Sequence, residues 1–371
     1  MKRIKNKKTP FYVFDTEKLK DNHSQIECAF KSVYENFRVG YSFKTNTYSK
    51  VCKLVKKLGC YAEVVSDYEY KKAKRFGYKE KDIIYNGVCK DIKQVKSCLK
   101  KGGKVNADNL QEVYKFIENG ITKFGLRVCF EIGNNVKSRF GVEYNSDDYR
   151  EIVKLHKDGL ITVEGLHCHF TNARDLCFWE ERAKQMVMIA KEFGIKFIEY
   201  LDFGGNMYSD MPDEMKNKIN RYIPNFEDYA KCLVEQIAKG WVKEDKLPEL
   251  IIETGTPMVA NAFSFVSCVL WLKETRSSKV AIMDCSQFDL GAISYVDNCP
   301  CRKLKEEKNE IKELVLLTGY TCMEDDVLKS DFEGSLRVGD KVVFDNCGAY
   351  SYIWSNDFIR PKAKVVTVWK E

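Results

Sequence analysis

The sequence predicts an α/β chain in two parts, in which parallel strands alternate with helices first and an all-β domain follows. From about Phe11 to about Thr254, short β-rich runs alternate with amphipathic helical stretches at intervals of about 25–40 residues. After about Ala260, almost all runs are of β type and turns separate them. The 371 residues also exceed a typical single domain of roughly 100–200 residues.

The strands of the first part are apolar runs that end in polar residues or glycine. Amphipathic helices lie between them, for example Ser49–Leu58 and Glu180–Glu192, whose apolar residues recur at helical spacing. This alternation favours a parallel sheet with right-handed crossovers, and eight such units would close into a barrel. The predicted strands are Val39–Phe43, Asp82–Tyr85, Phe124–Phe130, Thr162–His169, Phe197–Phe203 and Leu250–Glu253.

The second part has a different pattern, with one predicted helix near Asp326–Lys329. We expect the early strand within residues 8–14 to join it, so the predicted domains are residues 15–255 and residues 256–371 with that strand. The β-type runs of the second part are Phe263–Leu272, Val280–Met283, Leu314–Leu317, Lys341–Phe344 and Lys364–Trp369.

Composition argues against several classes of function. The net charge of +7 is spread along the chain without a dense basic block, so nucleic-acid binding has no support. No stretch approaches the roughly 20 apolar residues that span a bilayer, so we expect no membrane partner. Fifteen scattered cysteines predict reduced thiols in the cytoplasm. Cys299-Pro300-Cys301 and His167-Cys168-His169 lack the paired spacing of a zinc site, so no metal is predicted.

The segment Tyr41-Ser42-Phe43-Lys44-Thr45-Asn46 is a short apolar strand that ends in a lysine. Burying an unpaired ammonium costs several kcal/mol, so this is an awkward place for a purely structural lysine. A desolvated lysine loses its proton more easily and can form an imine with a carbonyl compound. Lys44 is therefore a candidate catalytic residue.

A series of motifs in the correct order extends over essentially the whole chain. It resembles the fold-type III, pyridoxal-phosphate-dependent decarboxylases of ornithine, arginine and diaminopimelate. The resemblance implies a (β/α)8 barrel, a C-terminal β domain that the first strand joins, and a homodimer with shared active sites. The motifs are YSFKTN at Lys44, AEVVSDYE from Ala62, NGVCKD from Asn86, GLRV at Gly125, KSRFGV at Lys137, GLHCHF at Gly165, LDFGG at Leu201, IIETG at Ile251, TGYTCMEDD at Thr318, and GD and GAYS at Gly339 and Gly348.

The resemblance implies a role for each matching residue. Lys44 would hold pyridoxal 5'-phosphate as an internal Schiff base, and Glu253 would keep the pyridine nitrogen protonated, because an opposite charge raises its pKa. Glu63 would orient Lys44 or the ring, His169 would stack on the ring, and Arg127 would hydrogen-bond inside the site.

The phosphate cup would form from glycine backbone N–H groups and a few side chains. Cys322 matches the cysteine that crosses from the partner subunit and reprotonates the product. The residues expected at the cup are Gly204, Gly205, Gly255, Thr256, Tyr350, and two asparagines, Asn172 and Asn206, at positions where the family has other residues.

Further departures concentrate at the substrate side. Thr256 replaces an arginine, the segment Asp284–Tyr295 lacks another, and Met323 replaces the acid that follows the loop cysteine. In relatives that use diaminopimelate, these groups grip the distal end of the substrate. We therefore expect an unusual L-amino acid, or an amino-acid-bearing intermediate that is free or carrier-linked. Thr256, Met323 and Asp289 are the candidates for its distal pocket.

Two alternatives remain at this point. A fold-type III racemase would share the barrel, but it uses a tyrosine as second base and lacks the loop that carries Cys322. A catalytically silent regulator would bind a partner protein instead of a cofactor, which the retained Lys44, Glu253, His169 and Cys322 argue against.

Overall fold

The computed structural model describes residues 6–133, 138–241, 246–291, 299–305 and 313–368. The chain divides into two compact units, which are described separately. One unit comprises residues 22–208 and 221–255, and the other comprises residues 1–21, 209–220 and 256–371. No helix among the described residues is long and apolar enough to cross a membrane.

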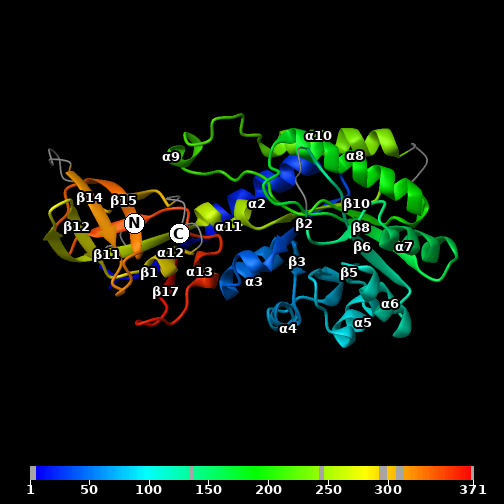
Figure 1. Cartoon of the computed structure of the whole chain (residues 1–371), viewed down its shortest axis with the longest axis horizontal. Coiled ribbons are helices and arrows are strands. Elements are labelled where there is room, and N and C mark those ends of the chain that lie inside the picture. Colours follow the sequence, from blue (N-terminus) through cyan, green and yellow to red (C-terminus); the bar gives the residue numbers. More distant parts are fainter. Residues whose placement is uncertain (1–5, 134–137, 242–245, 292–298, 306–312, 369–371) are drawn as a thin grey trace. The chain divides into compact units, whose positions relative to one another are not determined.

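The first unit is a closed barrel of eight parallel strands, as the sequence predicted. Neighbouring strands pair in parallel around the ring, and pairing between β5 and β6 closes it. Helices lie outside the strands (Figure 1). In ring order the strands are β2 (Phe37–Ser42), β3 (Tyr61–Val64), β4 (Ile83–Tyr85), β5 (Lys104–Ala107), β6 (Lys123–Cys129), β8 (Thr162–His167), β9 (Tyr200–Asp202) and β10 (Glu249–Thr254).

Several barrel helices begin where a polar side chain caps them. Ser66, Asp91, Asn109 and Ser146 each accept a hydrogen bond from a backbone N–H in the first turn of the following helix. The helices are α3 (Ser49–Lys57), α4 (Asp67–Arg75), α5 (Ile92–Lys100), α6 (Leu110–Glu118), α7 (Asp147–Lys157), α8 (Leu176–Phe193) and α10 (Phe226–Gly240), with most of α2 (Thr16–Lys31).

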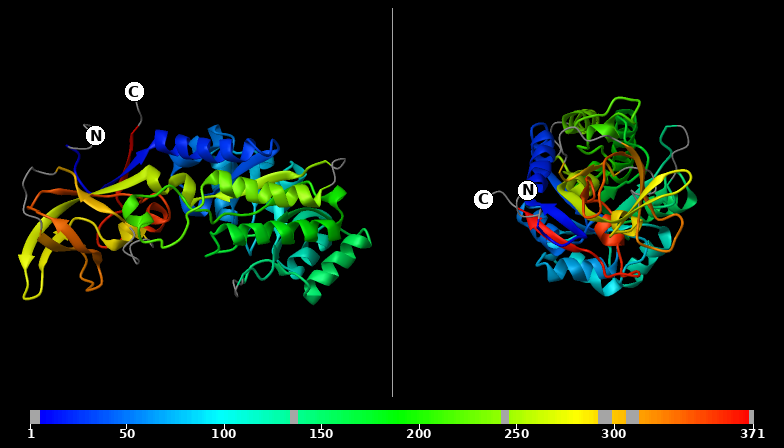
Figure 2. Two further views of the ribbon diagram at one scale, coloured as in Figure 1. Left: turned by 90° about the horizontal axis from the view of Figure 1, so that it is seen from above. Right: turned by 90° about the vertical axis from the view of Figure 1, so that its left-hand side faces the viewer.

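Helices α8 and α10 lie side by side in both views of the barrel (Figures 1 and 2). Trp179 of α8 is fully buried there, and its ring centroid lies 5.1 Å from that of Tyr229 on α10. Burying side chains of this size stabilises the packing by roughly 2–3 kcal/mol each. The pair fixes α8 against α10.

The second unit is a mixed β-sheet with short helices. Strand β1 (Phe11–Asp15) lies between β11 (Phe263–Glu274) and β17 (Lys364–Val368), antiparallel to β11 and parallel to β17. The other strands are β12 (Lys279–Met283), β13 (Cys301–Lys303), β14 (Glu313–Thr318), β15 (Val327–Gly334) and β16 (Lys341–Phe344), and the short helices are α9 (Asp213–Lys216), α11 (Thr256–Val259), α12 (Gln287–Leu290) and α13 (Ser351–Trp354).

The helix predicted near Asp326–Lys329 is wrong. Strand β15 occupies this region and pairs antiparallel with β14, with a register shift between the two strands. Leu328 and Phe332 are buried there, although their spacing of four residues also suits a helix face. Tertiary pairing with β14 decided between the two structures.

Candidate active site

Lys44 lies just beyond the end of β2, in a single turn of 3-10 helix over Phe43–Thr45. Its side chain is 37% exposed, and its Nζ lies 2.8 Å from Glu63 Oε2. The carboxylate of Glu63, at the end of β3, is 1% exposed. Lys44 is therefore not an unpaired buried ammonium. It is an accessible amine that a buried carboxylate holds in place.

Behind this pair lies a chain of buried side-chain amides to which the sequence pattern assigns no role. Tyr200 donates its hydroxyl hydrogen to Asn106 Oδ1 (2.7 Å), and Asn106 Nδ2 donates to Asn86 Oδ1 (2.8 Å). Asn86 Nδ2 then donates to Glu253 Oε1 (2.6 Å) and Glu63 Oε1 (3.3 Å). Asn86 thus joins the two buried carboxylates, and each donor in the chain points toward them.

Glu253 stands near the end of β10 and is 4% exposed. Burial alone would raise its pKa, but the nearby charges of His167 and Lys44, with the neighbouring Asp202 carboxyl group, lower the pKa overall. Burial and the Glu253 charge raise the pKa of Asp202 well above its usual range. Glu253 is the ionised member of this carboxyl pair.

Glu253 belongs to a buried trio with His167 and Asp202. One ring nitrogen of the histidine and one oxygen of each carboxyl group all lie within 4.8 Å of one another. His167 Nε2 lies 3.3 Å from Glu253 Oε2, and Gly204 donates its backbone N–H to Asp202 Oδ1 (2.9 Å). One of the two carboxyl groups keeps its proton, so the trio carries a single carboxylate charge. These contacts hold the Glu253 carboxylate in one orientation, in which it can accept a hydrogen bond from a cation or another N–H group.

His169 follows β8, and the backbone N–H of Gly205 donates to its Nδ1 (3.0 Å). Burial lowers the pKa of His169 well below its usual range, and the Lys44 charge adds to this effect. His169 is therefore neutral at neutral pH, with its proton on Nε2.

Gly204, Gly205 and Asn206 form a tight turn after β9. A Cβ on Gly205 would lie 2.3 Å from the carbonyl oxygen of Glu253, so only glycine fits. Gly204 and Asn206 have φ angles of +62° and +80°, and Asn206 Nδ2 is buried without a hydrogen-bond partner. The backbone N–H groups of Gly204 and Gly205 already donate to Asp202 Oδ1 and His169 Nδ1, so the donors that this turn leaves for the phosphate of pyridoxal phosphate are those of Asn206. The ionised Glu253 would fit the pyridinium of the same cofactor, and Lys44 its aldehyde.

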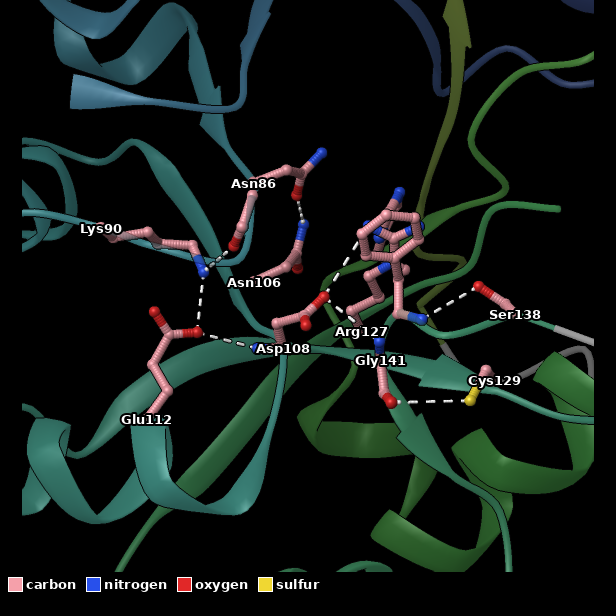
Figure 3. A network of polar contacts seen from close by, with 12 residues as sticks. Asn86, Lys90, Asn106, Asp108, Glu112, Arg127, Cys129, Ser138 and Gly141 are labelled. Carbon is pink, nitrogen blue, oxygen red and sulfur yellow. Dashed lines mark hydrogen bonds and ion pairs between the residues drawn. The ribbon is translucent and has the colours of Figure 1, made fainter. Parts of the chain in front are cut away.

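Arg127 on β6 lies beside the amide chain, in a network of charged groups (Figure 3). Its Nη1 is 3.7 Å from Asp108 Oδ1, and its guanidinium lies over the ring of Phe140. The same network contains a buried ion pair of Lys90 Nζ with Glu112 Oε2 at 2.7 Å. Arg127 Nε is buried without a hydrogen-bond partner.

Other predicted cofactor contacts lie near the barrel strands' ends. Gly255 follows β10, where a Cβ would lie 2.0 Å from Thr45 Oγ1. Asn172 is exposed with a φ of +60° in the loop after His169.

Five predicted residues belong to the other compact unit: Thr256, Asp289, Cys322, Met323 and Tyr350. Thr256 begins α11, and Tyr350 precedes α13 with a φ of +63°. Both carboxylate oxygens of Asp289 already accept hydrogen bonds, from Ser286 N and Ser355 Oγ. A substrate contact by Asp289 would have to compete with them.

Cys322 and Met323 are exposed on a loop whose conformation is fixed by hydrogen bonds to Asp326. Asp326 Oδ2 accepts hydrogen bonds from Thr321 Oγ1 (2.6 Å) and from Thr321 N (3.2 Å), and Asp326 Oδ1 accepts one from Gln287 N (2.8 Å). The loop is therefore ordered within its own unit, with the thiol facing outward.

Fold and site together define a pyridoxal-phosphate-dependent enzyme with a (β/α)8 barrel. Residues 17–260 match the family model described as the pyridoxal binding domain of pyridoxal-dependent decarboxylases. The chain belongs to this family, and it is a pyridoxal-phosphate-dependent decarboxylase that acts on an amino acid.

The chain is similar to several named relatives along most of its length. It is 29% identical to diaminopimelate decarboxylase of Methanocaldococcus jannaschii, over 94% of this chain and 84% of that protein. It is 25% identical to the Aquifex aeolicus diaminopimelate decarboxylase, over 97% of this chain and 86% of that protein. The crystal structure of the M. jannaschii enzyme in complex with L-lysine matches with a TM-score of 0.85 and 27% identity, covering 98% of this chain and 87% of that one.

Proposed function

We propose that Lys44 is the amine that binds the cofactor aldehyde. Three observations support this: its Nζ is accessible, a buried carboxylate holds it at 2.8 Å, and it stands at the carboxyl end of a barrel strand, where active sites of this fold lie. Bound pyridoxal phosphate supplies an aldehyde that condenses with amines and a protonated ring that accepts electrons as CO2 leaves.

The single observation that carries the proposal is the ionised, buried Glu253. His167 and Lys44 lower the pKa of this buried carboxylate, so Glu253 is ionised before a ligand binds, and an ionised carboxylate can accept a hydrogen bond from a protonated pyridine nitrogen. Asn86 and His167 hold the two carboxylate oxygens, so Glu253 cannot turn away from the ring. His169 remains neutral, so it can lie against the ring without competing for the negative charge.

Cys322 is our candidate for the group that returns a proton to the product. The exposed thiol on a loop ordered by Asp326 supports this role. We propose that the loop completes the active site of a second copy of the chain, which makes the enzyme a homodimer. Tyr350 and Thr256 are proposed to contact the cofactor phosphate, and the fifteen free thiols support a cytoplasmic location.

The substrate is proposed to be an L-amino acid without the distal charged end of diaminopimelate, or a derivatised or carrier-linked amino acid. Thr256 and Met323 carry no charge at positions where relatives that use diaminopimelate have an arginine and an acid. Met323 is 39% exposed, which leaves its apolar side chain available to a ligand. A charged distal group would lose its partners in such a pocket, which costs several kcal/mol.

The test begins with the visible spectrum of the purified protein. We expect an imine absorption band that disappears when borohydride reduces the bond, and mass spectrometry should then locate the cofactor on the peptide that contains Lys44. Lys44→Ala should lack the band, whereas Lys53→Ala, which removes an exposed lysine of α3, should keep it. A wild-type protein that takes up no pyridoxal phosphate would contradict the proposal.

Substrate class is tested by CO2 release from free, acylated and carrier-linked amino acids. Release from meso-diaminopimelate at the highest rate of the set would contradict the proposed substrate class. It would leave the cofactor site unaffected.

A further inference from the structure

Arg182 of α8 is completely buried, and among the described residues no carboxylate pairs with it; its guanidinium lies over the rings of Trp179 and Phe170, 4.5 Å and 5.3 Å from their centroids. Its guanidinium donates three hydrogen bonds to backbone carbonyl oxygens: from Nη2 to Ala173 (2.8 Å) and Phe170 (3.3 Å), and from Nη1 to Gly205 (3.2 Å). Burial lowers its pKa to about 10, so Arg182 is still charged at neutral pH. A buried charge without a counter-charge is costly, and a ligand anion would offset that cost.

The three carbonyl groups belong to two loops, one after His169 and one after β9. In a planar trans peptide, the N–H points away from the C=O of the same unit. The carbonyl groups of Phe170, Ala173 and Gly205 face Arg182, so the N–H groups of the next residues point away from it. Those residues are Thr171, Arg174 and Asn206, and within the described part of the chain their N–H groups have no acceptor.

The side chain of Asn206 offers a further open donor at these loops. The buried Asn206 Nδ2 has no partner, although burying an amide donor without one costs about 1–3 kcal/mol. The side-chain oxygen of Asn206, Oδ1, accepts a hydrogen bond from Arg174 Nε (3.0 Å). This bond connects the two loops and leaves the side-chain nitrogen of Asn206 to donate elsewhere.

We propose that Arg182 is a positioning residue for the cofactor phosphate: it turns the peptide donors of both loops outward and supplies the buried positive charge that balances the dianion. This inference rests on the proposed cofactor site and deepens it. Arg182 acts through the backbone, because its own nitrogens face the carbonyl groups. Its contribution is specific for a phosphate, since no other part of the cofactor carries two negative charges.

The experiment compares two ligands that differ only in this group, pyridoxal 5'-phosphate and pyridoxal. Their dissociation constants are measured by absorbance titration of the apoprotein for wild type, Arg182→Met and Lys184→Met. Arg182→Met removes the charge with little change in side-chain length. Lys184→Met is the matched control, because it removes a positive charge from the exposed face of the same helix.

Arg182→Met is expected to weaken binding of pyridoxal phosphate by about tenfold or more while pyridoxal changes less than about twofold. Lys184→Met should leave both constants unchanged. In 31P NMR spectra, the bound phosphate of Arg182→Met should take up its proton at a higher pH than in wild type, because a nearby positive charge favours the dianion.

Arg182→Lys keeps the charge and loses the forked geometry, so its loss of affinity for pyridoxal phosphate relative to pyridoxal should be smaller than that of Arg182→Met. The same variant replaces Arg182→Met in the experiment if Arg182→Met does not fold. Equal losses for both ligands, or unchanged pyridoxal phosphate binding, would overturn the role of Arg182. Absence of pyridoxal phosphate binding in the wild-type protein would instead contradict the cofactor site itself.

Discussion

Asn86 is expected to be the most sensitive position of the amide chain behind the active site, and Asn86→Ala is the decisive perturbation. The substitution removes the 2.6 Å hydrogen bond to Glu253, the 3.3 Å bond to Glu63 and the 2.8 Å bond from Asn106. It leaves two buried carboxylate oxygens, Glu253 Oε1 and Glu63 Oε1, and the buried amide donor Asn106 Nδ2 without these partners.

The magnitude is dominated by the two groups that lose a short hydrogen bond, Glu253 Oε1 (2.6 Å) and Asn106 Nδ2 (2.8 Å). Each buried polar group left unsatisfied costs about 1–3 kcal/mol, and more when the group is charged. The free energy of unfolding should therefore fall by about 2–5 kcal/mol in Asn86→Ala. Asn119→Ala is the matched control, because Asn119 donates one hydrogen bond at an exposed helix end and should cost less than about 0.5 kcal/mol.

The assay is urea unfolding of the apoprotein, followed by tryptophan fluorescence, for Asn86→Ala, Asn106→Ala and the double variant. Because Asn106 Nδ2 donates to Asn86 Oδ1, the two losses should not add, and the coupling energy should be about 1 kcal/mol or more. Additive losses, or a cost for Asn86→Ala no larger than that for Asn119→Ala, would refute the chain of hydrogen bonds.

Three further predictions concern the thiol, the pH dependence and the glycine turn. Cys322→Ala should lower turnover and scramble the deuterium stereochemistry of product formed in D2O, and unchanged stereochemistry would exclude a proton-donor role. Burial raises the pKa of Glu69 to about 7 from an unfolded value near 4.5, so the folded protein binds the extra proton and loses stability as pH rises through this window. The free energy of unfolding should therefore be lower at pH 8 than at pH 5, and Glu69→Gln should reduce this difference by up to about 3 kcal/mol. The control Glu118→Gln, at an exposed position, should leave the difference unchanged. Gly205→Ala would place a methyl group 2.3 Å from the Glu253 carbonyl oxygen, so the apoprotein should melt at a lower temperature and bind pyridoxal phosphate more weakly; an unaltered melting temperature would contradict the close approach.

The sequence predicted the barrel because hydrophobic periodicity is a local signal. The same signal failed at β15, where a spacing of four residues between Leu328 and Phe332 suits both a helix and a bent strand. Lys44 was predicted from a strand-end motif, but its pairing with Glu63 depends on the neighbouring strand.

The supporting residues could not be predicted in the same way. Asn86 and Glu253 are 167 positions apart and meet only when the barrel closes. An asparagine after a strand is also an ordinary turn signal, so its sequence context does not distinguish the two roles. Arg182 occupies a helix rich in charged residues, and only its complete burial distinguishes it from its exposed neighbours.

The pairing of β1 has a consequence for how the chain is made. Phe11, Tyr12 and Phe14 are buried between β11 and β17, and Phe11 lies opposite Lys364 in the last strand. During synthesis, this apolar strand therefore emerges from the ribosome long before either of its partner strands has been made. An unpaired strand of this composition is prone to aggregate, and β1 can complete both of its pairings only after β17 is synthesised.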